Sequence, residues 1–176
     1  MHKKPDLTKF TDDRYDSIVR YKTSYYSFCL PIRLAMFLAN IDDPKAHLKV
    51  EEILLKIGHL FQVQDDYLDC FGDPKVTGKI GTDIEDGKCS WPIVTALKIA
   101  NETQRNVIIQ NYGSQSEESV FEIKTIYSQL GIDHLFKNFE KDLFNQICAL
   151  IQSLDDKVLS KDVFYGLLAM IYQRKK

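Results

Sequence analysis

The sequence lacks the features that mark a membrane protein, a nucleic-acid-binding protein or a secreted protein. No hydrophobic run approaches the length of a membrane-spanning helix, and the first sixteen residues are too polar for a secretory signal. The 23 Lys and Arg residues nearly balance the 25 Asp and Glu residues, so the net charge of −2 gives no general attraction to nucleic acid or to an anionic membrane. We therefore expect a cytoplasmic protein that binds any phosphorylated ligand through a local group of charges.

The sequence also lacks paired cysteines. Its four cysteines, Cys29, Cys70, Cys89 and Cys148, lie far apart and show neither the spacing of a zinc site nor that of a redox motif. Isolated cysteines usually pack as small hydrophobic side chains. We expect reduced, mostly buried thiols, as is typical of an intracellular protein.

Convincing period-2 alternation of apolar and polar residues is absent too, which argues against a β-sheet. Apolar residues instead recur at helical spacing. The expected helices cover about 11–40, 44–69, 102–110, 115–130, 133–153 and 160–174, with a further helix starting at 90–92. The pattern predicts an all-α fold, and the length of 176 residues suits a single domain.

Several local signals predict where helices are interrupted or begin. Pro31 should bend the first helix and remove regular backbone hydrogen bonds between 21 and 31. Residues 42–44, Asp-Asp-Pro, have the order of a helix cap followed by a first-turn proline. Ser114 and Glu117 have the spacing of a capping box.

The run DDYLD near the end of the second long helix is the main candidate for chemistry. At 100° per residue Asp65 and Asp69 lie one turn apart with Asp66 beside them, so we expect the three carboxylates to converge. They would repel one another at the negative end of the helix dipole. A divalent cation removes both costs, and magnesium typically takes one or two carboxylates together with water and phosphate oxygens.

The plain alternative is that DDYLD is a solvated acidic helix end. The run from Asp12 to Asp16 has the same spacing, but it opens a helix, where acidic residues are expected, so we interpret it as structural. The run at 65–69 differs because the glycine-rich residues 72–87 follow it as an expected loop containing Lys79, with Lys88 next in the chain. Lysines beside such a metal suit a diphosphate, although a single lysine is more often simply at the surface.

Longer stretches of the sequence resemble one protein family. The segment FQVQDDYLDCFGDPKVTGKIGTDIEDGKCSWPIV, residues 61–94, is similar to the strongest signature of eukaryotic farnesyl diphosphate synthases, within the trans-isoprenyl diphosphate synthase family. The segment YKTSYYSF at 21–28, the segment 102–113 ending in NYG and the basic end at 171–176 follow that family in the same order. The resemblance covers nearly the entire chain, from about residue 7 onward.

This resemblance implies a helical isoprenoid-synthase fold and a single polyprenyl synthetase-type domain over 1–176, of which the N-terminal half is missing. It also implies an enzyme that transfers the prenyl group of dimethylallyl or geranyl diphosphate to isopentenyl diphosphate. Asp65, Asp66 and Asp69 would bind Mg²⁺. No general base is expected, because departure of diphosphate needs stabilisation of an anion more than transfer of a proton.

The same resemblance assigns the remaining site residues to two substrates. The allylic diphosphate would contact Lys22, Thr23, Gln62 and Lys79, of which Lys22, Thr23 and Lys79 would have the catalytic role of stabilising the departing diphosphate. Isopentenyl diphosphate would lie beside Phe61 and Arg174, with Lys88 as a further candidate.

The chain departs from the family pattern because the first aspartate-rich motif and its paired arginines do not appear in it. Near the end, Gln173 and Lys175 lower the arginine content. Three hypotheses remain. The first is a piece of an enzyme, either a fragment of a complete synthase or a half that works only with the other half supplied by a homodimer or another partner. The others are a non-catalytic paralogue that regulates a full-length synthase and a terpene synthase derived from this family. The sequence leaves product chain length and oligomeric state open.

Overall fold

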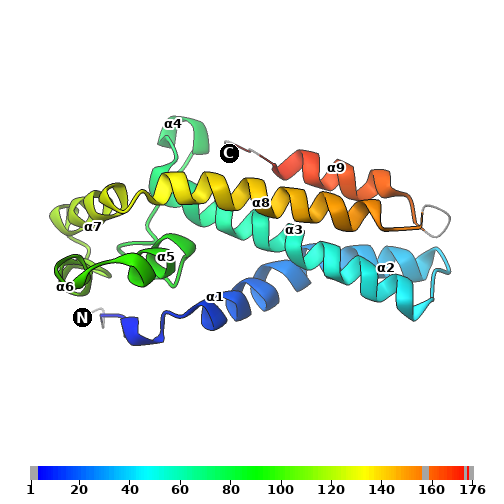
Figure 1. Cartoon of the computed structure of the whole chain (residues 1–176), viewed down its shortest axis with the longest axis horizontal. Helices are drawn as coiled ribbons and strands as arrows, with labels where there is room; N and C mark the ends of the chain where they lie inside the picture. The colour runs from blue at the N-terminus through cyan, green and yellow to red at the C-terminus, as the bar shows by residue number, and fades with distance from the viewer. Residues whose placement is uncertain (1–3, 156–158, 173, 175–176) are drawn as a thin grey trace. The chain divides into compact units, whose positions relative to one another are not determined.

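The structure, a computed structural model, describes residues 4–155, 159–172 and 174 (Figure 1). These residues form helices joined by turns and loops, and they contain no β-strand, as the sequence predicts. None of the helices in this part of the chain is long and apolar enough to cross a membrane.

The chain divides into two compact units. The first, which we call the loop unit, holds the described residues 4–15 and 63–138, and the second, the bundle unit, holds 16–62, 139–155, 159–172 and 174. Helices α3 (Pro44–Phe71) and α8 (Ile132–Gln152) each contribute residues to both units.

The N-terminal helical segment changes its hydrogen bonding along its length. A short 3-10 helix, η1 (Leu7–Lys9), precedes α1 (Asp12–Ile18), the π-helix η2 (Val19–Cys29) and α2 (Leu30–Leu38). The Leu30 amide donates to the Tyr25 carbonyl, five residues back, where an α-helix would use four. The predicted loss of regular α-helical bonding before Pro31 is confirmed, and Pro31 lies in the first turn of α2, which follows η2 without a break in the helical backbone.

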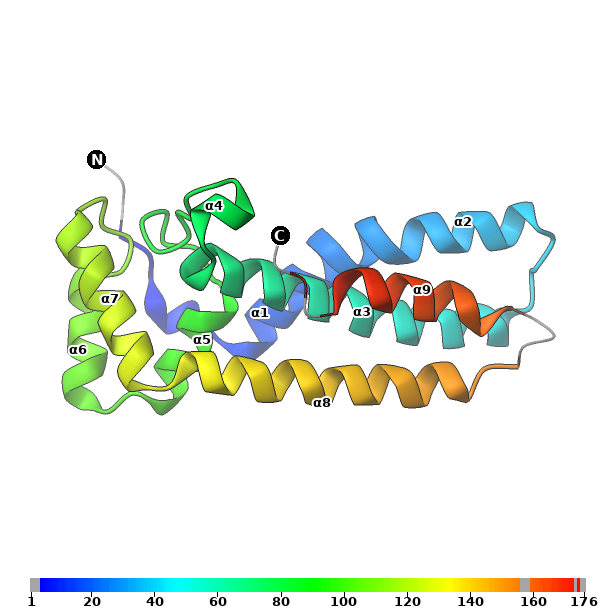
Figure 2. The ribbon, with the colours of Figure 1, turned by 90° about the horizontal axis from the view of Figure 1, so that it is seen from above.

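In the bundle unit α2 and α8 run along α3 (Figures 1 and 2), and buried apolar side chains form its core. Helix α3 begins at Pro44 after Asp43, whose carboxylate accepts hydrogen bonds from the Lys45 and Ala46 amides, so the predicted cap is confirmed. The core side chains come from η2, α2, α3, α8 and α9 (Lys161–Ile171). They are Cys29, Met36, Val50, Ile53, Leu54, Ile57, Leu60, Leu143, Ile147, Ile151, Phe164, Leu168 and Ile171.

The loop unit contains four further helices, α4 (Pro74–Thr77), α5 (Trp91–Ile99), α6 (Glu102–Asn111) and α7 (Glu117–Gln129). Asn101 and Gln104 form a capping box at the start of α6. The capping box predicted at Ser114 and Glu117 is wrong. The N-cap position of α7 is Ser116, whose side chain makes no capping hydrogen bond, so Ser114 lies too early and its hydroxyl instead accepts from the Ser116 amide.

The glycine-rich segment 72–87 is ordered and contains one short helix that the sequence did not predict. Asp73 caps α4 by accepting from the Lys75 amide, and Gly78, with φ of 76°, ends it in the left-handed conformation. The chain then passes back along the end of α3 and reaches α5. The loop is therefore a folded structure attached to the acidic helix end.

The four cysteines are free thiols. Cys29 and Cys70 are buried, whereas Cys89 and Cys148 are half-buried, so the expectation of mostly buried thiols holds for two of them. Burial raises the pKa of the Cys29 thiol to about 11 and raises that of Cys70 as well. Both buried thiols are therefore protonated at neutral pH.

Candidate metal and diphosphate site

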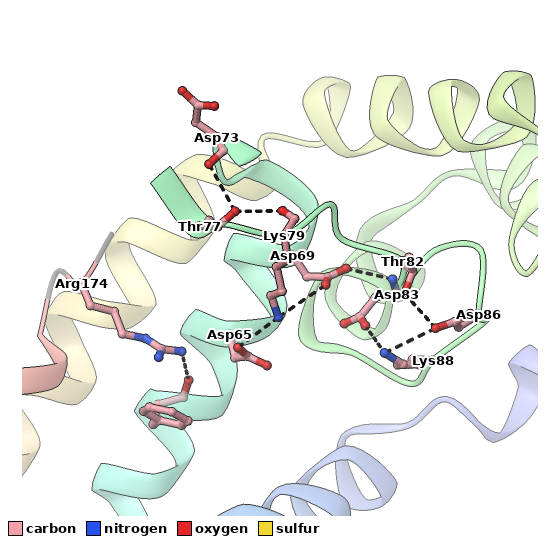
Figure 3. A network of polar contacts seen from close by, with 11 residues as sticks. Asp65, Asp69, Asp73, Thr77, Lys79, Thr82, Asp83, Asp86, Lys88 and Arg174 are labelled. Carbon is pink, nitrogen blue, oxygen red and sulfur yellow. Dashed lines mark hydrogen bonds and ion pairs between the residues drawn. The ribbon is translucent and has the colours of Figure 1, made fainter. Parts of the chain in front are cut away.

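Two carboxylates of the DDYLD motif face a lysine from the glycine-rich loop (Figure 3). The Lys79 ammonium lies 3.7 Å from Oδ1 of Asp65 and 3.9 Å from Oδ1 of Asp69. The two aspartates are one helical turn apart near the end of α3, so their side chains share a face. The Asp65 side chain is 44% exposed and that of Asp69 is 9% exposed, so the pair is open to solvent on the Asp65 side.

The loop backbone holds Asp69 in place. Oδ2 of Asp69 accepts a hydrogen bond of 2.8 Å from the Asp83 amide, which leaves Oδ1 on the side of Lys79. Gly81 lies so close to the helix end that a Cβ built on it would be 1.8 Å from the Asp69 carbonyl oxygen. The close approach therefore requires glycine at this position, and it brings Lys79 to the carboxylates.

Asp66 does not join this pair, and the prediction that three carboxylates converge is wrong. Asp66 is 5% exposed, and its Oδ2 accepts hydrogen bonds from the Tyr15 hydroxyl and the Trp91 amide, each at 2.8 Å. Trp91 is the first residue of α5, so Asp66 supplies an acceptor to the start of that helix. Adjacent residues on a helix point about 100° apart. The Asp66 side chain is therefore directed into the interior of the loop unit, whereas the Asp65 side chain lies at its surface.

The donor set at Asp65 and Asp69 fits a hard divalent cation. Among the residues that the structure describes, no group of three or more His, Cys, Asp or Glu side chains is arranged to hold a metal. Two carboxylates are enough for magnesium, which usually completes its shell with water and with phosphate oxygens of a ligand. Lys79 already shows that one positive charge is accommodated between the two aspartates.

Lys88, expected to contact isopentenyl diphosphate, is paired within the loop. Its ammonium lies 2.7 Å from Oδ1 of Asp83 and 3.5 Å from Oδ2 of Asp86 (Figure 3). The hydrogen bond that the Lys88 ammonium donates to Asp83 raises the pKa of Lys88. Burial raises the pKa of Asp83, and this effect outweighs the lowering caused by the hydrogen bond from Lys88. The ion pair joins the two ends of the segment 83–88. Burial of the Asp83 carboxylate opposes its stabilising effect.

Tyr112 stabilises the same loop through contacts with its backbone. Its hydroxyl donates to the Lys88 carbonyl at 2.6 Å and lies 3.3 Å from the Asp83 carbonyl, and its side chain is buried. The next residue, Gly113, has φ of 80° and donates its amide to the Ile84 carbonyl. Asp83 and Tyr112 are functional supports that the sequence reasoning did not identify, although the NYG run was visible as part of a family pattern.

The bundle unit holds five of the predicted substrate residues, and two of them are hydrogen-bonded to each other. The Thr23 hydroxyl lies 2.5 Å from Oε1 of Gln62, which joins η2 to α3. Thr23 is buried and its neighbour Lys22 is exposed. The structure therefore brings Thr23 and Gln62 together, and their place at the end of a substrate pocket stays a prediction.

Phe61 and Arg174 form the second pair in the bundle unit. The Arg174 guanidinium lies over the Phe61 ring at 4.0 Å from its centroid and donates to the Phe61 carbonyl at 3.3 Å. Phe28 packs edge-on against the same ring. The expected neighbourhood of Phe61 and Arg174 is thus present, whereas the predictions for Gln173 and Lys175 fall outside the described residues.

The helical fold and the paired aspartates define the class to which this chain belongs. The family model for polyprenyl synthetase matches residues 1–130. The chain belongs to the polyprenyl synthetase family.

Within that family, the chain is similar to farnesyl pyrophosphate synthases. It is 47% identical to the synthase of Bos taurus over 171 residues, which cover 97% of this chain and 48% of the bovine protein. The corresponding values for the synthase of Homo sapiens are 48% identity, 97% and 41%. The chain spans about half the length of the curated relatives it matches.

The solved structures agree with this comparison. The farnesyl diphosphate synthase of T. brucei complexed with risedronate matches with a TM-score of 0.91 at 33% identity, covering 99% of this chain and 50% of that one. The same synthase complexed with homorisedronate matches with a TM-score of 0.90 at 34% identity. The match confirms the predicted helical isoprenoid-synthase fold.

Proposed function

We propose that this chain provides the second magnesium and diphosphate site of a farnesyl diphosphate synthase-type prenyltransferase. The position of Lys79 between Asp65 and Asp69 supports the proposal most directly. A carboxylate pair with an adjacent ammonium can hold a metal and the anion bridged by it. Membership of the polyprenyl synthetase family supplies the reaction class.

In this proposal Mg²⁺ would be held by Asp65 and Asp69 and would supply positive charge to the oxygens of an allylic diphosphate. Lys79 would neutralise part of the remaining charge of that diphosphate. For the bundle unit by itself, we propose that Lys22 and the hydrogen-bonded pair of Thr23 and Gln62 contact an allylic diphosphate. Asp69 is kept oriented by the Asp83 amide, so little reorganisation is needed when the ligand arrives.

The reaction then needs stabilisation of charge more than acid or base groups. The carbon–oxygen bond of dimethylallyl or geranyl diphosphate breaks, diphosphate leaves with the electron pair, and an allylic cation forms. The double bond of isopentenyl diphosphate attacks this cation, and the departed diphosphate takes up the proton that is then lost, which gives the longer allylic diphosphate. Stabilising the departing diphosphate lowers the barrier directly, because that charge develops in the transition state.

The second substrate, isopentenyl diphosphate, is assigned to Phe61 and Arg174. The guanidinium stacked on the Phe61 ring is oriented by two contacts, which suits recognition of a phosphate. Lys88 has a weaker case, since Asp83 and Asp86 already take its charge. Because free thiols are typical of reducing compartments, we also propose that the reaction takes place in the cytoplasm.

Isothermal titration calorimetry with inorganic pyrophosphate tests the metal and diphosphate site. We expect binding in the presence of Mg²⁺ and little binding when EDTA replaces it. Asp65→Ala should abolish the Mg²⁺-dependent heat, and Lys79→Ala should weaken binding about tenfold, which corresponds to about 1.4 kcal/mol. Glu118→Gln, a change at an exposed acidic residue of α7, is the matched control and should bind like the unchanged chain.

Two results would overturn this assignment. One is pyrophosphate binding of equal strength with Mg²⁺ and with EDTA. The other is Mg²⁺-dependent binding that survives both Asp65→Ala and Asp69→Ala while the variants remain folded by circular dichroism.

A further inference from the structure

The first described residues, 4–15, lie in the same compact unit as the loop between α4 and α5, although they are far from it in the sequence. We call them the N-terminal arm. The Lys4 ammonium donates to the Gln110 carbonyl of α6 at 2.6 Å, and the Lys98 ammonium of α5 lies 2.7 Å from Oδ1 of Asp12. These contacts hold the arm against α5 and α6 (Figure 1).

Pro5 of the arm packs against two glycines that border the loop. A Cβ built on Gly87 would lie 2.9 Å from Cγ of Pro5, and one built on Gly113 would lie 2.5 Å from Cδ of Pro5. The Gly113 amide donates to the Ile84 carbonyl of the loop at 2.9 Å. Pro5 therefore packs at the place where the backbone after α6 is joined to the loop, and this packing leaves no room for a side chain on either glycine.

Phe10 of the arm contacts Tyr112, the residue that binds the loop carbonyls. The two rings meet edge-on at 90°, with their centroids 6.1 Å apart. The Tyr112 hydroxyl donates to the Lys88 carbonyl and lies 3.3 Å from the Asp83 carbonyl. The Asp83 amide in turn donates to Oδ2 of Asp69. A continuous set of contacts thus leads from Phe10 through Tyr112 and the loop to a carboxylate of the proposed metal site.

Tyr15, at the other end of the arm, contacts the helix that carries the aspartates. Its hydroxyl donates to Oδ2 of Asp66 on α3 at 2.8 Å, and Tyr15 is buried. The arm is therefore joined both to α3 and to the loop. The position of the loop relative to α3 sets the distance between Lys79 and the two carboxylates that it faces.

We propose that Pro5 and Phe10 are positioning residues of the metal and diphosphate site, because they hold the loop where it presents Lys79 and orients Asp69. This inference rests on the proposed function and adds residues that maintain the site without binding its ligands. Phe10 acts through Tyr112, and Pro5 acts through the backbone that it packs against. A site whose supporting residues are fixed needs little reorganisation when its ligand binds. Loosening the arm should therefore lower the affinity for pyrophosphate and Mg²⁺ while every ligand-binding side chain remains.

Amide hydrogen exchange followed by NMR tests the link from the arm to the loop, without metal or diphosphate. The Asp83 amide should exchange about tenfold faster in Phe10→Ala than in the unchanged full chain, because the loop opens more often. The Ile147 amide, in the bundle unit, should keep its exchange rate. Phe121→Ala is the matched control, since Phe121 is an aromatic residue of the same unit that is 68% exposed on α7, and it should leave the Asp83 amide unchanged.

Isothermal titration calorimetry with inorganic pyrophosphate and Mg²⁺ tests the link from the loop to the site. Phe10→Ala should weaken binding about fivefold, in line with the loss of an aromatic pair, and Phe10→Leu should weaken it less. Pro5→Ala should act in the same direction. In a Tyr112→Phe background Phe10→Ala should have little further effect, because the hydroxyl through which Phe10 acts is gone. A purely structural role would give the same loss in both backgrounds.

Three results would overturn the positioning role. They are an Asp83 exchange rate or a pyrophosphate affinity that is equal in the unchanged chain and both Phe10 variants, an undiminished effect of Phe10→Ala in the Tyr112→Phe background, and loss of the fold in both Phe10 variants by circular dichroism. Failure of the unchanged chain to bind pyrophosphate would overturn the proposed function and this inference with it. The two failures are distinguishable, because the exchange measurement uses no ligand.

Discussion

Asp65, Asp66 and Asp69 belong to one motif but have different surroundings. Asp65 is open to solvent beside Lys79, whereas Asp69 is fixed by the Asp83 amide and Asp66 is buried against Tyr15 and Trp91. A carboxylate that already accepts two buried hydrogen bonds serves the fold. One that shares an ammonium at the surface is available to a metal. The buried carboxylate and the pair proposed to bind a metal are therefore separated within a single helical turn.

This separation predicts opposite results for two alanine variants. Asp66→Ala leaves the buried Tyr15 hydroxyl and Trp91 amide without this acceptor, so we expect a loss of about 2–3 kcal/mol in the free energy of unfolding. Asp65→Ala removes an exposed side chain and should change stability by no more than about 0.5 kcal/mol. Urea unfolding followed by circular dichroism measures both. Equal stabilities of the two variants would contradict the assignment.

Gly81 lies where the close approach of the loop to α3 leaves no room for a side chain. Gly81→Ala would place a methyl group 1.8 Å from the Asp69 carbonyl oxygen, so the loop has to move away from α3. We expect a loss of about 1–3 kcal/mol in stability, as in other overpacked sites, together with weaker Mg²⁺-dependent pyrophosphate binding.

Gly166→Ala is the matched control for this change. Gly166 lies within α9, and a Cβ there meets no atom within 4 Å. Alanine favours a helix interior over glycine by up to about 1 kcal/mol, so this variant should be unchanged or slightly more stable. Thermal and urea unfolding measure the stability of both variants. An unchanged stability of Gly81→Ala would show that the loop does not need its close approach to α3.

At the scale of elements, the loop between α4 and α5 is the part that organises the site. It brings Lys79 to α3, donates the Asp83 amide to Asp69 and is closed by the Lys88 pair. Tyr112, at the end of α6, binds two of its carbonyls. The loop is ordered because its polar backbone groups find partners, which a sequence rich in glycine and charge does not reveal by itself.

The Asp83–Lys88 pair predicts a pH dependence that appears when Lys88 is removed. Burial already raises the pKa of Asp83, and Lys88→Met removes the hydrogen bond that opposes this rise. A carboxyl group with a raised pKa in the folded state contributes stability below its unfolded pKa, near 3.8, and loses it as the pH rises through the folded pKa. We therefore expect Lys88→Met to lose stability between about pH 4 and pH 7.

The loss at pH 7 should be about 1 kcal/mol, well below the cost of breaking a fully buried pair, because the Lys88 side chain is 52% exposed. Urea unfolding at several pH values measures it. The double variant Asp83→Asn, Lys88→Met is the control, since it has no carboxyl group to titrate and should not show the slope. A slope of the same size in both would assign the effect to other groups.

At the scale of the whole molecule, the helical class and most helix positions followed from apolar periodicity, and the carboxylate motif was visible as a pattern. The direction of Asp66 did not follow, because it depends on Tyr15 and Trp91, which are distant in sequence. The direction of Lys88 did not follow either, because its pairing with the nearby Asp83 depends on how the loop folds. Spacing on one helix places side chains on a face. It cannot tell which of them a neighbouring element will bury.

The length of the relatives adds the remaining feature at this scale. The chain matches about half of the bovine synthase and about half of the T. brucei synthase.

A crystal structure of the chain with Mn²⁺ in place of Mg²⁺ and with risedronate, the ligand of the T. brucei synthase, is the most direct test of the metal and diphosphate site. The account predicts an anomalous peak bound by Asp65 and Asp69, with Lys79 on the phosphonate and Asp66 still hydrogen-bonded to Tyr15 and Trp91. A peak bound through Asp66, or a risedronate molecule bound away from Asp65 and Asp69, would contradict it.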